Sequence, residues 1–521
     1  MGSMNRKALA VALLAIIVML VLLRVFNVGH VLGYDEAWNS NSVMDVATGR
    51  TGDVFYNNFL RHPPLYTGLG AVYALLTGAG RVGVSQGMEM MSLICAAALA
   101  IVIFFCGRDW FGDLAGLSAA FLFAVMPAAR VYDTLVKQES MTMLFTMLFV
   151  LFFFREKYLL SGAFLGCAML TKEIFVFTPV AVFLFLLAAR RHKQIKWFFA
   201  SLGIGAAVSL WWYLFVSRSK GEFLQFFLGR SLESKNWRQP WYYYLKLIPS
   251  DVGWIVVALT VAGMVFLALR VKKEGWPGRN ATDAETGVRG AAQTWQMAFL
   301  PVIWVLFVYT FLSFSLGKPP WLIYSALPAF AILGGWGVSE GYRLLSAKRK
   351  TGKAVAAVVL AAALALSIPV GFTSFLTHAD PKYRSSLRYG RVAGYMNASM
   401  SEDGRVMLRV NDFSPTLAFY LKNYRPESVM VLDAESLRDG RIREPGYNVF
   451  IFERDEDLQT VLDQIRSVEP DFVMLRPGFR SADGTDIAVA LSGLARPTRF
   501  GSVWVFDGGD LRGALGRSGT H

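Results

Sequence analysis

Residues 8–26 read ALAVALLAIIVMLVLLRVF, an almost unbroken apolar run. The run is too long for the core of a signal peptide and lacks a small-residue cleavage site, so we expect a retained membrane anchor. The polar sequence Gly33-Tyr34-Asp35-Glu36 follows shortly after it. The sequence therefore predicts a membrane helix with an acidic pair near the point where the chain leaves the bilayer.

The chain as a whole is too apolar for a soluble protein. Of its 521 residues, 54% are hydrophobic and 14% aromatic, and the mean hydropathy is +0.41. These values are typical of a polytopic α-helical membrane protein. Much of the net charge of +14 falls in short loops between apolar runs. We attribute it to positive-inside topology and anionic headgroups rather than to a nucleic-acid partner.

Neither the cysteines nor the histidines predict a cofactor. Cys95, Cys106 and Cys167 lie in or beside apolar runs, which indicates buried small side chains. The five histidines show no metal-ligand spacing. We therefore expect no metal ligand set and no required cofactor, and leave a divalent metal open.

Apolar runs that are long enough to cross a membrane, or nearly so, recur through the first 376 residues. With the N-terminus inside, they place the C-terminus outside, and we expect about 11–13 transmembrane helices. The runs lie at 8–26, 86–106, 114–130, 139–154, 158–171, 174–189, 197–216, 251–270, 295–315, 321–338 and 354–376.

The stretch 65–79 is apolar but short, and two prolines precede it. If it does not cross, every short basic loop falls on the same side as Arg6-Lys7, which is the positive-inside arrangement. We therefore predict a helix that lies along the membrane. The loops that decide this contain Arg108, Arg155 and Lys157, residues 190–193, residues 270–273 and residues 348–350.

The same topology places several segments on the outer face, and these carry cations that a topology rule would not put there. The outer segments are 27–85, 131–138, the corner Thr171-Lys172-Glu173, 217–250 and 317–320. Among these cations are Arg61, Arg130, Lys137, Lys172, Arg230, Lys235, Arg238 and Lys318.

The composition changes after about residue 376. We expect a membrane domain over 1–376, with 27–85 as an outer loop that contains interfacial helices, and a soluble α/β domain over 377–521. Neither a dinucleotide-binding motif nor a P-loop occurs in the second domain. Predicted strands are Arg405–Val410, Val429–Leu432, Asn448–Phe452, Asp471–Leu475 and Ser502–Phe506, and predicted helices are Thr416–Leu421 and Leu458–Val468.

Two pairs of carboxylate residues on the outer face are candidates for acid–base chemistry. Asp35 and Glu36 follow the first span, and Asp133 and Glu139 flank Lys137 in the turn before the span at 139–154. A carboxylate at a helix end is commonly just solvated. Two acidic loops that face one cleft could instead deprotonate an acceptor hydroxyl or amine and orient it.

Cations at the same boundary could bind an anionic leaving group. Arg61, Lys172 and Lys318 adjoin or precede apolar runs, where cations often reach to lipid headgroups. Several of them together would stabilise negative charge on a departing phosphate. Residues 238–244 combine Arg238 with four aromatic side chains, which fits interfacial anchoring, sugar stacking or a lipid groove.

Taken in order, these motifs resemble the GT-C glycosyltransferases, specifically the branch of the protein O-mannosyltransferases and the lipid A aminoarabinose transferase. The resemblance covers about residues 8–340, and the C-terminal domain more loosely. It depends on Tyr34-Asp35-Glu36, His62-Pro63-Pro64-Leu65-Tyr66, Arg130 with Glu139, Thr171-Lys172, Arg238-Gln239-Pro240-Trp241-Tyr242-Tyr243, and Lys318 with Tyr324 and Pro328.

The resemblance implies an enzyme that moves a sugar from a polyprenyl phosphate of the undecaprenyl type to an envelope acceptor: lipid A, another glycolipid or glycan, or a protein. It implies no obligatory metal and a place in the bacterial inner membrane, with the active site and the C-terminal domain facing the periplasm. Its implied catalytic residues are Asp35 as general base, Glu36 and Glu139; its phosphate-binding residues are Arg61, His62, Lys172 and Lys318; and its pocket residues are Tyr34, Tyr66, Asp133, Arg238, Tyr242 and Tyr324.

The alternative from another class is a transporter or flippase of lipid-linked sugars. Such proteins place ionisable groups near the middle of the membrane and often show inverted repeats. Here the charges gather at one interface and no repeat is visible. The pattern therefore favours chemistry at the membrane surface.

Overall fold

The computed structural model describes most of the apolar part of the chain and much of the C-terminal domain. The described residues are 5–50, 62–172, 176–220, 239–274, 291–315, 317–346, 383–401, 403–409, 414–422, 424, 429–432, 448–452, 457–478 and 484–518. The predicted span 354–376 and the predicted domain boundary lie outside them.

The chain divides into two compact units. The first contains Met1–Gly29, Phe59–Tyr73 and Ser85–Ala379, and the second contains His30–Asn58, Ala74–Val84 and Asp380–His521. The outer loop after the first span is thus shared between the two units. The acidic pair Asp35-Glu36 belongs to the same unit as the C-terminal domain.

The first unit is made of helices. Most of them are predominantly apolar along their length, as membrane-spanning helices are. They are α1 (Arg6–Val25), α4 (Leu65–Thr77), α5 (Arg81–Phe111), α6 (Asp113–Val125), α7 (Pro127–Tyr132), α8 (Glu139–Phe154), α9 (Tyr158–Met169), α10 (Phe177–Ala188), α11 (His192–Lys220), α13 (Tyr243–Val252), α14 (Trp254–Glu274), α15 (Phe299–Phe314) and α16 (Leu327–Ser346), with the 3₁₀ helices η4 (Ala291–Ala298) and η5 (Pro320–Ala326). The end of α4 from Ala74 and the start of α5 as far as Val84 belong to the second unit.

Among the described residues, six helical segments are long and apolar enough to cross a membrane, and five shorter apolar helices accompany them. The protein is therefore a multi-pass membrane protein. Apart from 114–130, each predicted span from 8–26 to 321–338 coincides with a helix to within a few residues at most ends. The stretch 65–79 forms the helix α4, as predicted, and its orientation in the bilayer stays a prediction.

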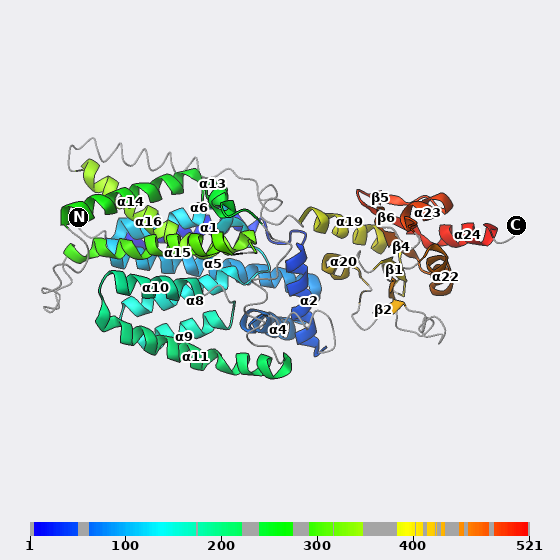
Figure 1. Cartoon of the computed structure of the whole chain (residues 1–521), viewed down its shortest axis with the longest axis horizontal. Coiled ribbons are helices and arrows are strands. Elements are labelled where there is room, and N and C mark those ends of the chain that lie inside the picture. Colours follow the sequence, from blue (N-terminus) through cyan, green and yellow to red (C-terminus); the bar gives the residue numbers. More distant parts are fainter. Residues whose placement is uncertain are drawn as a thin grey trace. The chain divides into compact units, whose positions relative to one another are not determined.

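Glycines bring the helix backbones close together. Figure 1 shows α9 beside α11, and α16 beside α6 and α14, and these helices share extensive contacts. A Cβ atom at Gly335 would lie 2.6 Å from the carbonyl oxygen of Ala115, and one at Gly337 would lie 2.5 Å from that of Leu259. Small residues at helix crossings are the usual means of packing in a membrane, where apolar burial supplies little drive for association.

Proline and glycine set two helix boundaries that differ from the predicted spans. The helix predicted over 114–130 ends at Val125, because Pro127 cannot continue it and instead starts the short helix α7. The span predicted over 251–270 begins at Trp254, since Gly253 has a φ of +90° and separates α13 from α14. Asp251 consequently lies on a short helix that precedes the span.

The second unit contains a mixed sheet between two layers of helices. Strand order is β2-β3-β1-β4-β6-β5, with β2, β3, β1 and β4 parallel and β6 and β5 antiparallel. The strands are β1 (Val406–Arg409), β2 (Val429–Leu432), β3 (Val449–Phe452), β4 (Phe472–Leu475), β5 (Thr498–Phe500) and β6 (Val503–Asp507), and the helices are α2 (Tyr34–Thr48), α19 (Tyr383–Ser399), α20 (Pro415–Tyr420), α22 (Leu458–Val468), α23 (Ile487–Leu494) and α24 (Gly508–Ser518).

Buried side chains of the strands alternate between two apolar cores, as the twofold strand period requires. Val406 and Leu408 pack with α19 and α20, whereas Met407 packs with α22, α23 and α24. The α/β prediction for this part of the chain is confirmed, and all five predicted strands and both predicted helices are present. Strand β5 and helices α19, α23 and α24 were not predicted.

Candidate functional site

An ion pair and two hydroxyl groups surround Asp133, which follows α7. Arg24, near the end of α1, donates from Nε to Asp133 Oδ2 at 2.8 Å. Ser140 donates to Asp133 Oδ1 at 3.1 Å, and the Tyr324 hydroxyl donates to the same oxygen. Burial raises the pKa of Asp133, and the charge of Arg24 with these hydrogen bonds opposes that shift. The buried carboxylate therefore links α1, α8 and η5 to the end of α7.

A second ion pair lies next to the first along the chain. Lys172, three residues after the end of α9, contacts Glu139, which begins α8 and is fully buried. Among the described residues, Glu139 Oε2 has no hydrogen-bond partner. An anion that enters here would compete with Glu139 for the lysine, because the two opposite charges now balance each other.

The segment between α15 and η5 presents a third cation. The Lys318 ammonium donates to the carbonyl oxygen of Ser315, and the Tyr244 hydroxyl donates to the Pro319 carbonyl oxygen at 2.9 Å. Burial lowers the pKa of Lys318. Lys137 lies over the ring of Trp321, 4.2 Å from its centroid. Tyrosine and tryptophan side chains thus fix the backbone and the charges of this turn.

The His62-Pro63-Pro64 sequence is tied to the Lys172 corner by the backbone. The Leu65 N–H donates to the carbonyl oxygen of Leu170 at 2.8 Å. The buried Tyr66 hydroxyl lies 3.2 Å from the hydroxyl of Ser92, which in turn donates to the Leu135 carbonyl oxygen at 2.9 Å. Pro63-Pro64 therefore begins α4 at a place set by α9, and Tyr66 links that helix to the acidic turn.

These turns come together at one end of the helix bundle. Helix η5, which carries Tyr324, contacts α7, α8 and α15. The predicted residues of the first unit that the structure brings into this region are His62, Tyr66, Asp133, Glu139, Lys172, Lys318 and Tyr324. Tyr242 is half exposed and packs its ring edge-on against Trp241. Arg61 and Arg238 lie outside the described residues.

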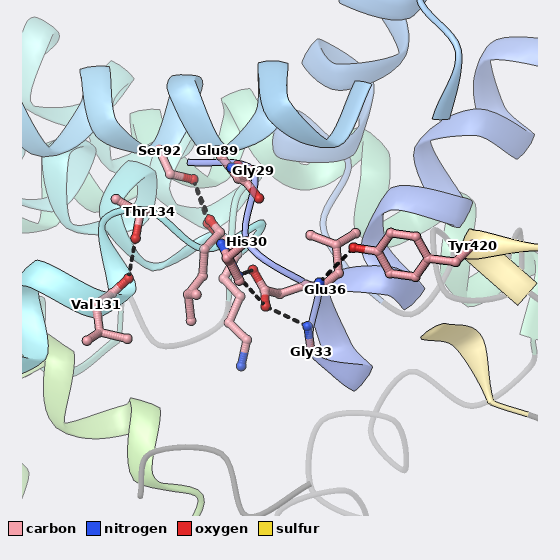
Figure 2. A network of polar contacts seen from close by, with 12 residues as sticks. Gly29, His30, Gly33, Glu36, Glu89, Ser92, Val131, Thr134 and Tyr420 are labelled. Carbon is pink, nitrogen blue, oxygen red and sulfur yellow. Dashed lines mark hydrogen bonds and ion pairs between the residues drawn. The ribbon is translucent and has the colours of Figure 1, made fainter. Parts of the chain in front are cut away.

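The remaining predicted residues form the N-terminus of α2 in the second unit. Glu36 accepts a hydrogen bond from the Gly33 N–H at 2.8 Å, which is the half of a capping box that a glycine N-cap allows. His30 Nε2 lies 3.1 Å from both Glu36 carboxylate oxygens. Figure 2 shows these side chains at the start of the helix. The partly exposed Asp35 sits one residue earlier, in the first turn, where the helix dipole favours a carboxylate. Burial and, secondly, the charge of Asp35 raise the pKa of Tyr34.

Some residues of the network were missed by sequence reasoning. Arg24 is the only charged residue of the first apolar run and is fully buried. A single charge within an apolar run indicates a buried partner of opposite charge, and this could have identified Arg24. Ser92 and Ser140 are also fully buried in the network, and nothing in the sequence distinguishes them from other serines of apolar helices.

Comparisons with known proteins agree with this fold. Residues 61–213 match the family model of dolichyl-phosphate-mannose-protein mannosyltransferases. The structure of ArnT from Cupriavidus metallidurans bound to undecaprenyl phosphate is similar to this chain with a TM-score of 0.64 and 17% identity, over 96% of this chain and 97% of ArnT. No curated protein matches the chain in sequence.

A more distant likeness extends to the Archaeoglobus fulgidus oligosaccharyltransferase tethered with an acceptor peptide. Its TM-score is 0.53 at 12% identity, over 91% of this chain and 69% of the oligosaccharyltransferase. The same architecture thus recurs in enzymes of different sequence. Together with the family match, these structures confirm the predicted resemblance: the chain has the fold of the GT-C superfamily of membrane glycosyltransferases.

Proposed function

We propose that the protein transfers a sugar from a polyprenyl phosphate, of the undecaprenyl type, to an acceptor of the cell envelope. The observation that carries this proposal is the gathering of Lys172, Lys318 and Lys137 with two buried carboxylates at one end of the bundle. Basic side chains at a water-poor boundary suit the phosphate of a lipid donor. Bound undecaprenyl phosphate in the similar ArnT structure supports this assignment.

In the proposed reaction an acceptor hydroxyl or amine attacks the anomeric carbon of the donor sugar. Asp35 takes the proton of the acceptor, the new bond forms at the anomeric carbon, and the bond from that carbon to the phosphate oxygen breaks with inversion. The electron pair stays on the phosphate, whose charge Lys172 and Lys318 offset, with Arg61 or His62 as further contacts. Tyr34, Tyr66, Asp133, Arg238, Tyr242 and Tyr324 are the proposed pocket residues.

Glu36 and Glu139 take different parts from Asp35 in this proposal. Glu36 already caps its own helix and pairs with His30, so it holds the first turn of α2 rather than accepting a proton. Glu139 holds Lys172 until the donor phosphate replaces it. Asp35 is partly exposed, which suits a base that must meet an acceptor.

The proposed location is a bacterial inner membrane, with the site and the C-terminal domain on the periplasmic side. The short basic loops support this side, since they would then face the cytoplasm. The acceptor could be lipid A, another glycolipid or glycan, or a protein, and the sugar could be a hexose or a pentose. No metal is required by the proposal.

The test is sugar transfer from labelled undecaprenyl-phosphate donors to envelope acceptors by the wild type and Asp35→Asn. We expect transfer by the wild type and a loss of at least about a hundredfold in the variant, the scale of losing a general base. Asp463→Asn, which changes an exposed carboxylate of α22, is the matched control and should transfer at the wild-type rate. Movement of intact donor across vesicles without transfer would replace this proposal with a flippase.

A further inference from the structure

The short helix α20 of the C-terminal domain touches the segment that leads into α2. The Leu32 N–H donates to the Tyr420 hydroxyl at 3.0 Å, and Figure 2 shows the Tyr420 ring reaching this backbone. Leu32 immediately precedes Gly33, the N-cap of α2. The hydroxyl of Tyr420 thus fixes the backbone three residues before Asp35.

The neighbouring residue Val31 is seated against α19. A Cβ atom at Gly390 would lie 3.1 Å from Val31 Cγ1 and 3.9 Å from the ring of Tyr420. Glycine at this position therefore leaves the space that Val31 occupies between α19 and α20. Leu32 is therefore held by the Tyr420 side chain, and Val31 lies against the α19 backbone at Gly390. Both contacts are made by the C-terminal domain.

On the far side of Asp35, Trp38 packs against the apolar core formed by α19, α20 and the sheet. Farther along α2, the Asn41 amide donates to the carbonyl oxygen of Pro415, at the start of α20, at 3.4 Å. The helix that carries Asp35 is consequently attached to the C-terminal domain both before and after that residue.

Arg81, the first residue of α5, holds the other end of α20. Its guanidinium donates to the Ala418 carbonyl oxygen at 3.2 Å and to the Tyr424 carbonyl oxygen at 2.6 Å, and lies 5.1 Å from the Tyr424 ring centroid. A cation at a helix C-terminus satisfies carbonyl groups that have no partner within the helix. Helix α20 is therefore fixed independently of its contacts with α2.

We propose that the C-terminal domain positions the general base, and that Tyr420 is the positioning residue through which it acts. This proposal rests on the proposed function, in which Asp35 is the base. Tyr420 does not touch the reacting atoms; its hydroxyl sets the first turn of α2 and so the direction of the Asp35 carboxylate. A fixed base loses less entropy in reaching the acceptor than one on a loose helix end.

Tyr420→Phe is the variant that tests this proposal, because it keeps the ring and removes only the hydroxyl. We expect kcat for sugar transfer to fall about fivefold, the scale of one net hydrogen bond, with the KM for the lipid-phosphate donor within about twofold of wild type. Tyr395→Phe is the matched control: its hydroxyl bonds Thr498 at an exposed site of the same domain, and kcat should not change.

Amide hydrogen exchange over residues 30–38 supplies a readout that does not depend on transfer. Tyr420→Phe should exchange about fivefold faster there, whereas Tyr395→Phe should match the wild type. Unchanged kcat, unchanged exchange, or an equal loss of kcat in Tyr395→Phe would each overturn the positioning role.

Two further results separate the two proposals. If the wild type transfers no sugar while Tyr420→Phe still loosens residues 30–38, the proposed function fails and the attachment of α2 stands as a structural role only. Gly390→Ala gives an independent check, since its methyl group would press on Val31. It should lower kcat with an unchanged donor KM, and a wild-type kcat for this variant and for Tyr420→Phe would overturn the proposal.

Discussion

Arg24 and Asp133 form an ion pair across 109 positions of sequence, with an Nε–Oδ2 distance of 2.8 Å and no exposure of either side chain. Arg24 also donates to the carbonyl oxygen of Ala124 at 2.9 Å. The end of α1 is thereby joined to α6 and to the acidic turn. The turn that carries Glu139 and Ser140 takes its position partly from this pair.

Replacing Arg24 with Met should destabilise the protein by about 3–5 kcal/mol, because Asp133 would be left buried without its cation. The measurement is thermal unfolding of the detergent-solubilised protein. Arg155→Met is the control, since its ion pair with Asp109 is partly exposed and such pairs contribute about 0–1 kcal/mol. The double variant Arg24→Met with Asp133→Leu should recover part of the loss, and an equal or larger loss in the double variant would contradict this account.

The same pair shows how far the sequence could predict this structure. Hydropathy alone located the long apolar helices, since a membrane span needs only a long apolar run. It could not pair Arg24 with Asp133, because the partner of a buried charge depends on how distant helices pack. The break at Pro127 was readable from local chemistry and was overlooked within an otherwise continuous apolar run.

In the C-terminal domain, the strands were predicted because short β-rich runs repeat there. Helix α19 was not predicted, because its sequence has no apolar run. It contains Arg384, Arg388 and Arg391 among serines and glycines. The attachment of α2 to this domain was also missed, since it depends on single contacts such as Leu32 to Tyr420. Of the site, residue types and order were predictable, whereas the pairing of Lys172 with Glu139 was not.

Glu139 and Lys172 should affect the binding of a lipid phosphate in opposite directions. Glu139→Gln removes the charge that now balances Lys172, so we expect undecaprenyl phosphate to bind about threefold to tenfold more tightly, a gain of about 1 kcal/mol. Lys172→Gln removes the cation and should weaken binding by a similar factor. Titration with undecaprenyl phosphate in detergent micelles measures both. Weaker binding by both variants would show instead that the intact ion pair shapes the pocket.

Lys318 should make donor binding sensitive to alkaline pH. Burial lowers the pKa of its ammonium, and only the protonated form attracts a phosphate, so affinity should fall as pH rises, at a lower pH than for an ordinary lysine. Lys318→Arg should keep its affinity through the same range, because a guanidinium stays charged. The affinity for undecaprenyl phosphate measured across pH tests this. Parallel declines in wild type and Lys318→Arg would exclude Lys318 as the titrating group.

Asp251 should lower the stability of the protein as pH rises. It is buried on α13, its Oδ2 has no hydrogen-bond partner among the described residues, and burial raises its pKa to about 8. Between about pH 4 and pH 8 the unfolded chain has lost this proton while the folded protein retains it. Stability from this group therefore declines through that window, by at most about 1.4 kcal/mol per pH unit.

Asp251→Asn should remove this dependence, since the amide is neutral at every pH of the window. The melting temperature of Asp251→Asn relative to wild type should therefore be higher at pH 8 than at pH 5. Asp463→Asn on the exposed face of α22 is the control and should show the same small difference at both pH values. If Asp251→Asn is less stable than wild type at pH 8, the carboxylate is held in its charged form in the folded protein by a favourable partner, and the sign argued here is wrong.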